Sequence, residues 1–227
     1  MRFEPYTTVS MEGVQMPKVR ELFVSVDKGY VSTLPRFVYE GRIVVVHSLL
    51  ETERALQALY KTTSIVGVDT ETRPVFRKGV RHKVALLQVA SPEICFLFRL
   101  SMIGLPPSLL AFLEDPNMLK VGLSLKDDLS SLRQRQDFTP AGFLDLQPYV
   151  KEMGISDMSL QKLYANVFGM RISKSAQCSN WEAETLSETQ KRYAATDAYT
   201  CLQLYKELSA LRADRQFVVN EFPQPIV

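Results

Sequence analysis

The sequence predicts an α/β domain with a mixed central β-sheet that is flanked by helices. Three observations support this prediction: a hairpin of two apolar strands, strand–helix alternation after it, and a length of 227 residues that can bury a sizeable core. The hairpin is predicted at 84–98, where VALLQVAS and ICFLF flank the turn residues SPE. A hairpin followed by strands connected through helices gives a sheet with both strand orientations.

The elements before the hairpin follow from apolar residues in strand and helix patterns. GRIVVVHS at 41–48 has the β-branched run of a strand, and residues 48–61 repeat apolar side chains at helical spacing. The Ser48 hydroxyl can cap the start of that helix. SIVGVDTE at 64–71 is again a strand, because its first half is apolar and β-branched.

Helices and strands alternate after the hairpin. A helix is predicted at 106–115 because the segment opens with prolines. The other predicted elements are, in order, a strand at 118–123, a helix at 124–136, a strand at 143–150, a helix at 159–169 and a long helix at 187–211. Gly169 is placed to end the helix before it, and Ser187 is placed to cap the last helix.

The two ends of the chain show no clear pattern. Residues 1–40 contain prolines and few periodic apolar positions, and the last residues, QFVVNEFPQPIV, indicate no element. We therefore predict an N-terminal extension at 1–40, one functional domain at 41–211 and a C-terminal tail at 212–227.

Composition excludes several classes of protein. Lys and Arg number 27 against 25 Asp and Glu, so the net charge of +2 selects no class of partner. Cys95, Cys178 and Cys201 are far apart and form no CxxC pair, which argues against a zinc ribbon and a disulfide framework. The N-terminus has no apolar signal segment, and no apolar run approaches the roughly 18 residues of a membrane span. We expect a cytoplasmic protein with no membrane partner.

Two acids stand at the end of the predicted strand 64–71. Asp69 and Glu71 are two residues apart, so their side chains point to the same face of the sheet. Two carboxylates held together repel each other unless a cation joins them, and oxygen ligands favour hard cations such as Mg²⁺ or Mn²⁺. The alternative is that the strand has reached its solvated end and that both acids are surface residues.

The long helix carries a second pair. Tyr193 and Asp197 are four residues apart and share a helix face, and three small residues around them, Ala194, Ala195 and Ala198, permit close packing. Asp has poor helix propensity in this position, and a bound metal could compensate for it. The alternative is a surface acid beside a tyrosine at the edge of the core.

A third candidate follows the predicted strand 118–123. Asp127 and Asp128 lie in the first turns of the next helix, where the helix dipole alone favours negative charge. The leucines of this helix mark its core side, and Asp128 lies nearer to that side than Asp127 does.

These three segments resemble the motifs of the DEDDy-type 3′–5′ exonucleases, the group that contains ribonuclease D and the exonuclease domain of the Werner syndrome protein. The motifs appear in order as Asp69-Thr70-Glu71, as Val121-Gly122 followed by Asp128, and as Tyr193 with Asp197. The flanking sequences VALLQVA, which contains Gln88, and KSAQCSNW at 174–181 also match. The resemblance covers about residues 41–211, although the Arg-Pro-Leu that often follows the tryptophan in ribonuclease D is replaced after Trp181 by Glu-Ala-Glu-Thr-Leu.

The resemblance implies a ribonuclease H-like fold and hydrolysis of phosphodiester bonds from a free 3′ end of DNA or RNA. It implies two divalent cations, Mg²⁺ or Mn²⁺, with Asp69 as a ligand of both. Glu71 and Asp197 complete the site for the attacking water, Asp128 holds the second cation, and Tyr193 orients the water. The rival hypothesis is a catalytically silent nucleic-acid-binding module that keeps the fold; protein partners are not indicated.

Substrate contacts are predicted from basic and aromatic residues near these motifs. The segment RPVFRKGVRHK at 73–83 holds five Lys and Arg residues and no acid, which suits phosphate groups, although it could be an ordinary solvated turn. The residues predicted to contact nucleic acid are Thr70, Phe76, Arg77, Lys78, Gln88, Lys174 and Trp181.

Overall fold

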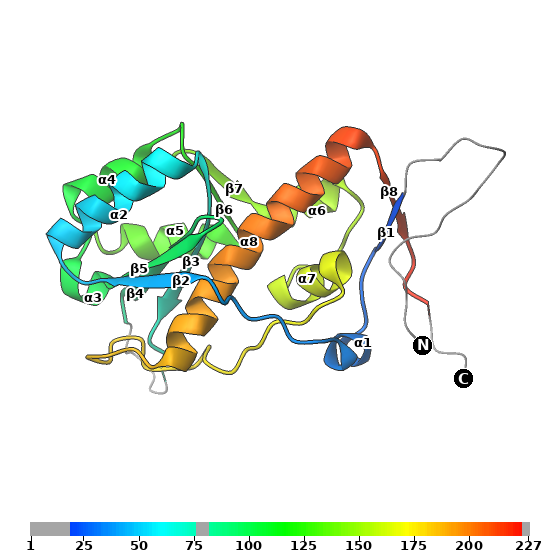
Figure 1. The fold of residues 1–227 in the computed structure, drawn as a ribbon, viewed down its shortest axis with the longest axis horizontal. Helices are drawn as coiled ribbons and strands as arrows, with labels where there is room; N and C mark the ends of the chain where they lie inside the picture. The colour runs from blue at the N-terminus through cyan, green and yellow to red at the C-terminus, as the bar shows by residue number, and fades with distance from the viewer. Residues whose placement is uncertain (1–18, 76–81, 224–227) are drawn as a thin grey trace. The chain divides into compact units, whose positions relative to one another are not determined.

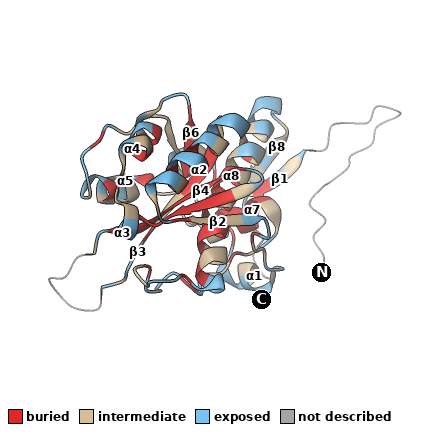
Figure 2. Cartoon of the chain, turned by 60° about the vertical axis from the view of Figure 1, so that its left-hand side comes forward, coloured by how far each residue is buried: buried red, intermediate tan, exposed pale blue. Residues whose placement is uncertain are grey.

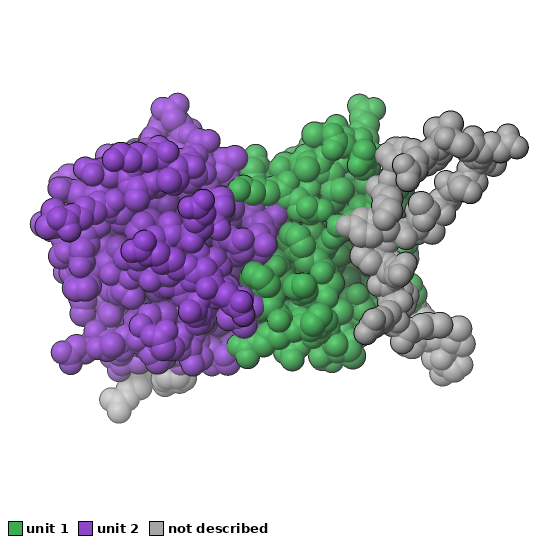
Figure 3. Space-filling model, viewed as in Figure 1, with its two compact units in different colours: residues 1–37, 147–172, 204–227 green, residues 38–146, 173–203 purple. Residues whose placement is uncertain are grey.

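The computed structural model describes residues 19–75 and 82–223, and these contain two β-sheets. Contacts between residues divide the chain into two units (Figure 3). Unit 1 consists of Met1–Phe37, Gln147–Ile172 and Leu204–Val227, and unit 2 consists of Val38–Leu146 and Ser173–Gln203. The predicted boundaries at 40 and 211 remain a prediction.

The sheet of unit 2 has six strands in the order β2-β5-β4-β3-β6-β7. Their bounds are β2 (Arg42–Val46), β3 (Ile65–Thr72), β4 (Val84–Ala90), β5 (Ile94–Phe98), β6 (Leu119–Gly122) and β7 (Phe143–Asp145). Strand β4 runs antiparallel to both of its neighbours, whereas the other pairs are parallel. The predicted hairpin and the predicted mixed sheet are therefore confirmed.

Helices cover both faces of this sheet. On one face, α2 (Leu49–Thr62) and α4 (Pro107–Glu114) lie side by side (Figure 1). Their apolar residues pack on Val66 and Val68 of β3. On the other face, the first half of α8 (Glu188–Asp214) packs its alanines on Leu86 and Leu97. All seven residues of β4, the strand between β3 and β5, are buried (Figure 2). Two shorter helices, α3 (Leu100–Ile103) and α5 (Leu125–Arg133), complete this unit.

Helix starts in unit 2 follow the predicted capping chemistry. The Ser48 hydroxyl accepts a hydrogen bond from the Glu51 N–H at 3.3 Å at the start of α2. At the start of α8, the Ser187 hydroxyl accepts from the Gln190 N–H at 3.2 Å, and the Gln190 side chain accepts from the Ser187 N–H at 3.0 Å. This reciprocal pair is a capping box, which explains why the long helix begins at this point.

The strand predicted at 143–150 is wrong beyond Asp145. The chain turns there into α6 (Leu146–Glu152). Pro148 lies in the first turn of this helix, where a missing N–H leaves no helical hydrogen bond unmade. The apolar residues of this stretch are compatible with either element, so their pattern alone did not separate them.

Unit 1 pairs the two ends of the described chain. Strand β1 (Arg20–Phe23) runs parallel to β8 (Phe217–Asn220), and α1 (Lys28–Thr33) and α7 (Leu160–Phe168) belong to the same unit. Both strands lie where no element was predicted. Gly169 ends α7 as predicted, with a positive φ of 61° that suits glycine.

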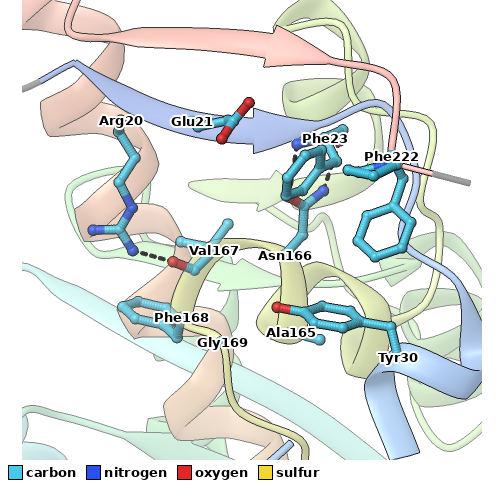
Figure 4. A pocket seen from close by; sticks show the side chains of 11 residues that line it. Arg20, Glu21, Phe23, Tyr30, Ala165, Asn166, Val167, Phe168, Gly169 and Phe222 are labelled. Atoms are coloured by element: carbon cyan, nitrogen blue, oxygen red, sulfur yellow. Dashed lines mark hydrogen bonds between the residues drawn. The ribbon is translucent and has the colours of Figure 1, made fainter. Parts of the chain in front are cut away.

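A pocket of about 240 Å³ lies in unit 1 (Figure 4). Tyr30 and Phe222 lie on one side of it, with ring centroids 4.9 Å apart. The Asn166 side chain in its wall is paired with the backbone of Phe23, accepting at 2.9 Å and donating at 2.7 Å.

Among the helices in the described ranges, none combines the length and the apolar character that a membrane crossing needs.

Candidate active site

Three carboxylates meet at the end of β3. Asp69 and Glu71 point to the same face of the strand, as their spacing predicts, and Asp197 approaches them from α8. One oxygen from each lies within 4.8 Å of the others. A Cβ added to Gly67 would lie 1.9 Å from the Ala198 carbonyl oxygen, so glycine at this position lets α8 pack directly on the backbone of β3.

Burial and mutual repulsion disfavour the charged forms of these three acids. Burial and the charges of Asp197 and Asp128 raise the pKa of Glu71 to about 9. The pKa of Asp69 is raised well above its ordinary value by burial and by the same neighbours, and burial raises the pKa of Asp197 to about 7. Such a group of acids must hold protons or a cation, and clustered oxygen ligands suit a hard divalent cation.

Asp128 lies beside this group and is held separately. Its carboxylate accepts a hydrogen bond from the Thr70 hydroxyl of β3. The pKa of Asp128 is raised to about 6, and burial is the largest cause. The charges of Asp127 and Asp145 also raise it, whereas the Thr70 hydrogen bond lowers it. Asp128 is close enough to raise the pKa of both Asp69 and Glu71, whereas Asp127 is exposed, as the leucine pattern predicts.

Tyr193 stands one helical turn before Asp197. Burial, together with the negative charges of Asp197 and Glu71, raises its pKa well above the ordinary value. Its ring packs near Trp181, with centroids 6.1 Å apart, and Trp181 is fully buried. The phenol therefore keeps its proton at neutral pH and serves as a hydrogen-bond donor next to Asp197.

The predicted substrate contacts have different surroundings. Phe76, Arg77 and Lys78 lie outside the described residues. Gln88 and Trp181 are fully buried, a position that favours a packing role over contact with a nucleotide. Lys174 is exposed and lies near enough to Asp197 for its positive charge to lower the pKa of that acid.

Gln88 is unusual because its whole side chain is buried. It lies directly opposite Asp69 on the neighbouring strand β4. Neither the nitrogen nor the oxygen of its amide has a hydrogen-bond partner among the described residues. Its polar end thus lies on the same sheet face as the carboxylates.

Sequence reasoning did not identify Glu182. Its carboxylate lies 3.3 Å from Arg73 and 3.4 Å from His82, two residues of the basic segment 73–83. Arg99 donates to the carbonyl oxygens of Ala183 and Glu184, the latter at 3.2 Å. The Glu-Ala-Glu sequence after Trp181 was visible as a departure from ribonuclease D, but its partners are more than 80 residues away in sequence.

Comparison with known proteins gives relatives of one kind. A family profile described as 3′–5′ exonuclease matches residues 43–211. The mouse bifunctional 3′–5′ exonuclease/ATP-dependent helicase WRN is 34% identical over 164 residues, which are 69% of this chain and 12% of the relative. Human exonuclease 3′–5′ domain-containing protein 2 is 32% identical over 209 residues, which are 83% of this chain and 33% of that protein. The chain thus spans a third or less of the length of these relatives.

Solved structures share the fold. The exonuclease domain of Nibbler from Aedes aegypti superposes with a TM-score of 0.71 at 21% identity, covering 80% of this chain and 94% of that one. Ribonuclease D from Escherichia coli gives a TM-score of 0.65 at 22% identity, covering 74% and 46%. These likenesses confirm the predicted ribonuclease H-like fold. The profile match over most of the chain shows that the chain belongs to the 3′–5′ exonuclease domain family.

Proposed function

We propose that this chain is a metal-dependent 3′–5′ exonuclease that hydrolyses phosphodiester bonds from the free 3′ end of DNA or RNA. The observation that carries the proposal is the convergence of Asp69, Glu71 and Asp197, with Asp128 beside them. None of the ion pairs between described residues neutralises these acids. A purely structural role would leave this concentration of buried negative charge without compensation.

The donor set fits two hard divalent cations, Mg²⁺ or Mn²⁺. All four side chains offer carboxylate oxygens, which these ions prefer over softer ligands. Asp69, Glu71 and Asp197 would hold one cation, and Asp69 and Asp128 would hold the other. When bound, the pair lowers the pKa of the attacking water and offsets the charge that develops on the leaving 3′ oxygen.

The residues around the acids orient the reactants. Tyr193 keeps its proton, so its hydroxyl can donate a hydrogen bond that orients the attacking water, and this favours orientation over general-base action. Lys174 offers a positive charge near Asp197, where the anionic substrate would arrive. Hydrolysis from the 3′ end releases nucleoside monophosphates.

The proposed substrates include both DNA and RNA. A solved structure of ribonuclease D from Trypanosoma brucei is a complex with RNA U12, and that is a property of that protein.

We also propose a reducing compartment such as the cytoplasm. Cys95 and Cys201 are buried, Cys178 is exposed, and none of the three forms a disulfide.

A panel of labelled substrates tests the proposal. Single-stranded DNA, single-stranded RNA and duplexes recessed at either end are incubated with Mn²⁺, Mg²⁺ or EDTA. We expect shortening from the 3′ end that EDTA abolishes and that Asp69→Asn abolishes. Asp127→Asn is the matched control, because it removes the same charge from an exposed residue next to Asp128. Binding without shortening under every metal condition would instead support the silent nucleic-acid-binding module.

A further inference from the structure

The helix that carries Asp128 begins in an unusual way. Its N-cap residue, Ser124, has a left-handed backbone with a φ of 61°, and the Ser124 side chain makes no capping hydrogen bond. The group that caps the helix comes instead from strand β7. The Asp145 carboxylate accepts the Ser124 N–H on Oδ1 and the Leu125 N–H on Oδ2, both at 2.9 Å.

Asp145 reaches this helix start because of the sheet register. It is the last residue of β7 and lies opposite Gly122, the last residue of β6. A left-handed conformation is unfavourable for a non-glycine residue, so it persists only where the surroundings hold it. A carboxylate that binds two N–H groups at a helix N-terminus supplies such a hold, and the helix dipole adds to it.

The junction between β6 and α5 leaves little freedom. A Cβ on Gly122 would lie 2.4 Å from Leu125 Cδ2 and 2.9 Å from the Val68 carbonyl oxygen, so the helix start packs directly on the strands. Asp128 is the fourth residue of α5, and its carboxylate accepts from the Thr70 hydroxyl. The start of α5 is therefore held by Asp145, and the Asp128 carboxylate is held by Thr70.

We propose that Asp145 is a positioning residue of the catalytic site. Asp145 binds the backbone N–H groups at the start of α5, and the Thr70 hydroxyl binds the Asp128 carboxylate. Together these contacts fix Asp128 relative to Asp69 and Glu71. Asp145 makes these bonds with backbone groups and is not itself counted among the acids that hold cations. The inference rests on the proposed function, because Asp128 needs exact placement only if it helps to bind a cation.

The test compares two helix caps with the same chemistry. Asp27 caps α1 by accepting from the N–H groups of Gly29 and Tyr30, and α1 carries no site residue. Asp145→Ala and Asp27→Ala should each lose the stability of one cap. Only Asp145→Ala should raise the Mn²⁺ concentration for half-maximal cleavage, by about 10-fold or more, while KM for a labelled oligonucleotide stays unchanged.

Two further variants keep the test decisive if Asp145→Ala folds poorly. Thr70→Val keeps the shape but removes the hydroxyl donor, and Thr70→Ser restores it. We expect the Mn²⁺ requirement to rise in Thr70→Val and to return near the wild-type value in Thr70→Ser. The inference is overturned if Asp145→Ala and Thr70→Val require no more Mn²⁺ than Asp27→Ala does.

Calorimetric titration with Mn²⁺ alone separates this inference from the proposed function. Wild-type protein that binds Mn²⁺ but cleaves nothing would contradict the exonuclease proposal only. Under that outcome, weaker Mn²⁺ binding in Asp145→Ala than in Asp27→Ala would still support the positioning role. Equal binding in the two variants would refute it.

Discussion

The neighbouring parallel strands β6 and β3 both carry charged side chains, but the groups around these side chains differ. On β6, Lys120 is fully buried, and its ammonium donates to the carbonyl oxygens of Phe112 at 3.0 Å and Asp115 at 2.8 Å. The same nitrogen lies 5.2 Å and 5.0 Å from the ring centroids of Phe112 and Phe143. On β3, Asp69 and Glu71 face a third acid and pair with no cation among the described residues.

The difference separates a charge that serves the fold from charges that serve a ligand. Lys120 donates to carbonyl oxygens at the C-terminal end of α4, and these hydrogen bonds offset part of the cost of its burial inside the protein. The acids of β3 raise the free energy of the metal-free folded state, and only an external cation or protons can relieve their repulsion. We therefore expect mutations in the acid cluster and a mutation of Lys120 to have opposite effects on stability and activity.

The largest effect is expected from Asp197→Asn. Removing one of three converging carboxylates should reduce cleavage by at least about 10³-fold, because charge stabilisation at such centres is worth that much or more. The same change should raise the melting temperature in EDTA, since it relieves repulsion, and should abolish the further rise that Mn²⁺ gives the wild type. Rates on a 3′-labelled oligonucleotide and thermal unfolding measure both effects. Near-normal cleavage, or a lower melting temperature in EDTA, would contradict the comparison.

An intermediate effect is expected from Tyr193→Phe. The phenyl ring keeps the packing on Trp181 but loses the hydroxyl donor, so kcat should fall by about 10²-fold with Mn²⁺ affinity unchanged. Tyr199→Phe is the control on the same helix, because the Tyr199 ring packs on Tyr39, 4.7 Å between centroids. Steady-state kinetics and Mn²⁺ titration check the prediction. Equal kcat in the two variants would leave Tyr193 as a packing residue.

The smallest effect on activity is expected from Lys120→Met. Two carbonyl oxygens lose their donor, so the free energy of unfolding should fall by about 1–3 kcal/mol, while cleavage by the folded protein stays unchanged.

The pH dependence of this loss has a definite sign. Burial lowers the pKa of Lys120 from 10.5 to about 8 in the folded protein. Between these values the unfolded chain binds the proton and the folded protein does not, so the contribution of Lys120 to stability rises with pH. The gap between wild type and Lys120→Met should therefore widen from pH 8 to pH 10 in urea unfolding. Parallel stability curves would contradict the lowered pKa of Lys120.

Local spacing predicted most of the site. A period of two residues placed Asp69 and Glu71 on one face of β3, and a period of about four placed Tyr193 and Asp197 on one face of α8. The leucine pattern correctly separated Asp128 from the exposed Asp127. These predictions succeeded because side-chain direction within one element depends on the backbone geometry of that element alone.

The sequence by itself therefore determined the mixed α/β sheet, the exonuclease family and the shared faces of Asp69 with Glu71 and of Tyr193 with Asp197, because short-range periodicity and ordered motifs carry that information. Only the tertiary structure decided the contacts between distant segments: Asp145 at the start of α5, Glu182 between Arg73 and His82, and β1 beside β8, whose paired residues Arg20 and Phe217 lie near opposite ends of the chain. Such contacts depend on how strands are ordered and on how closely helices pack, and neither is encoded in the spacing of any one segment.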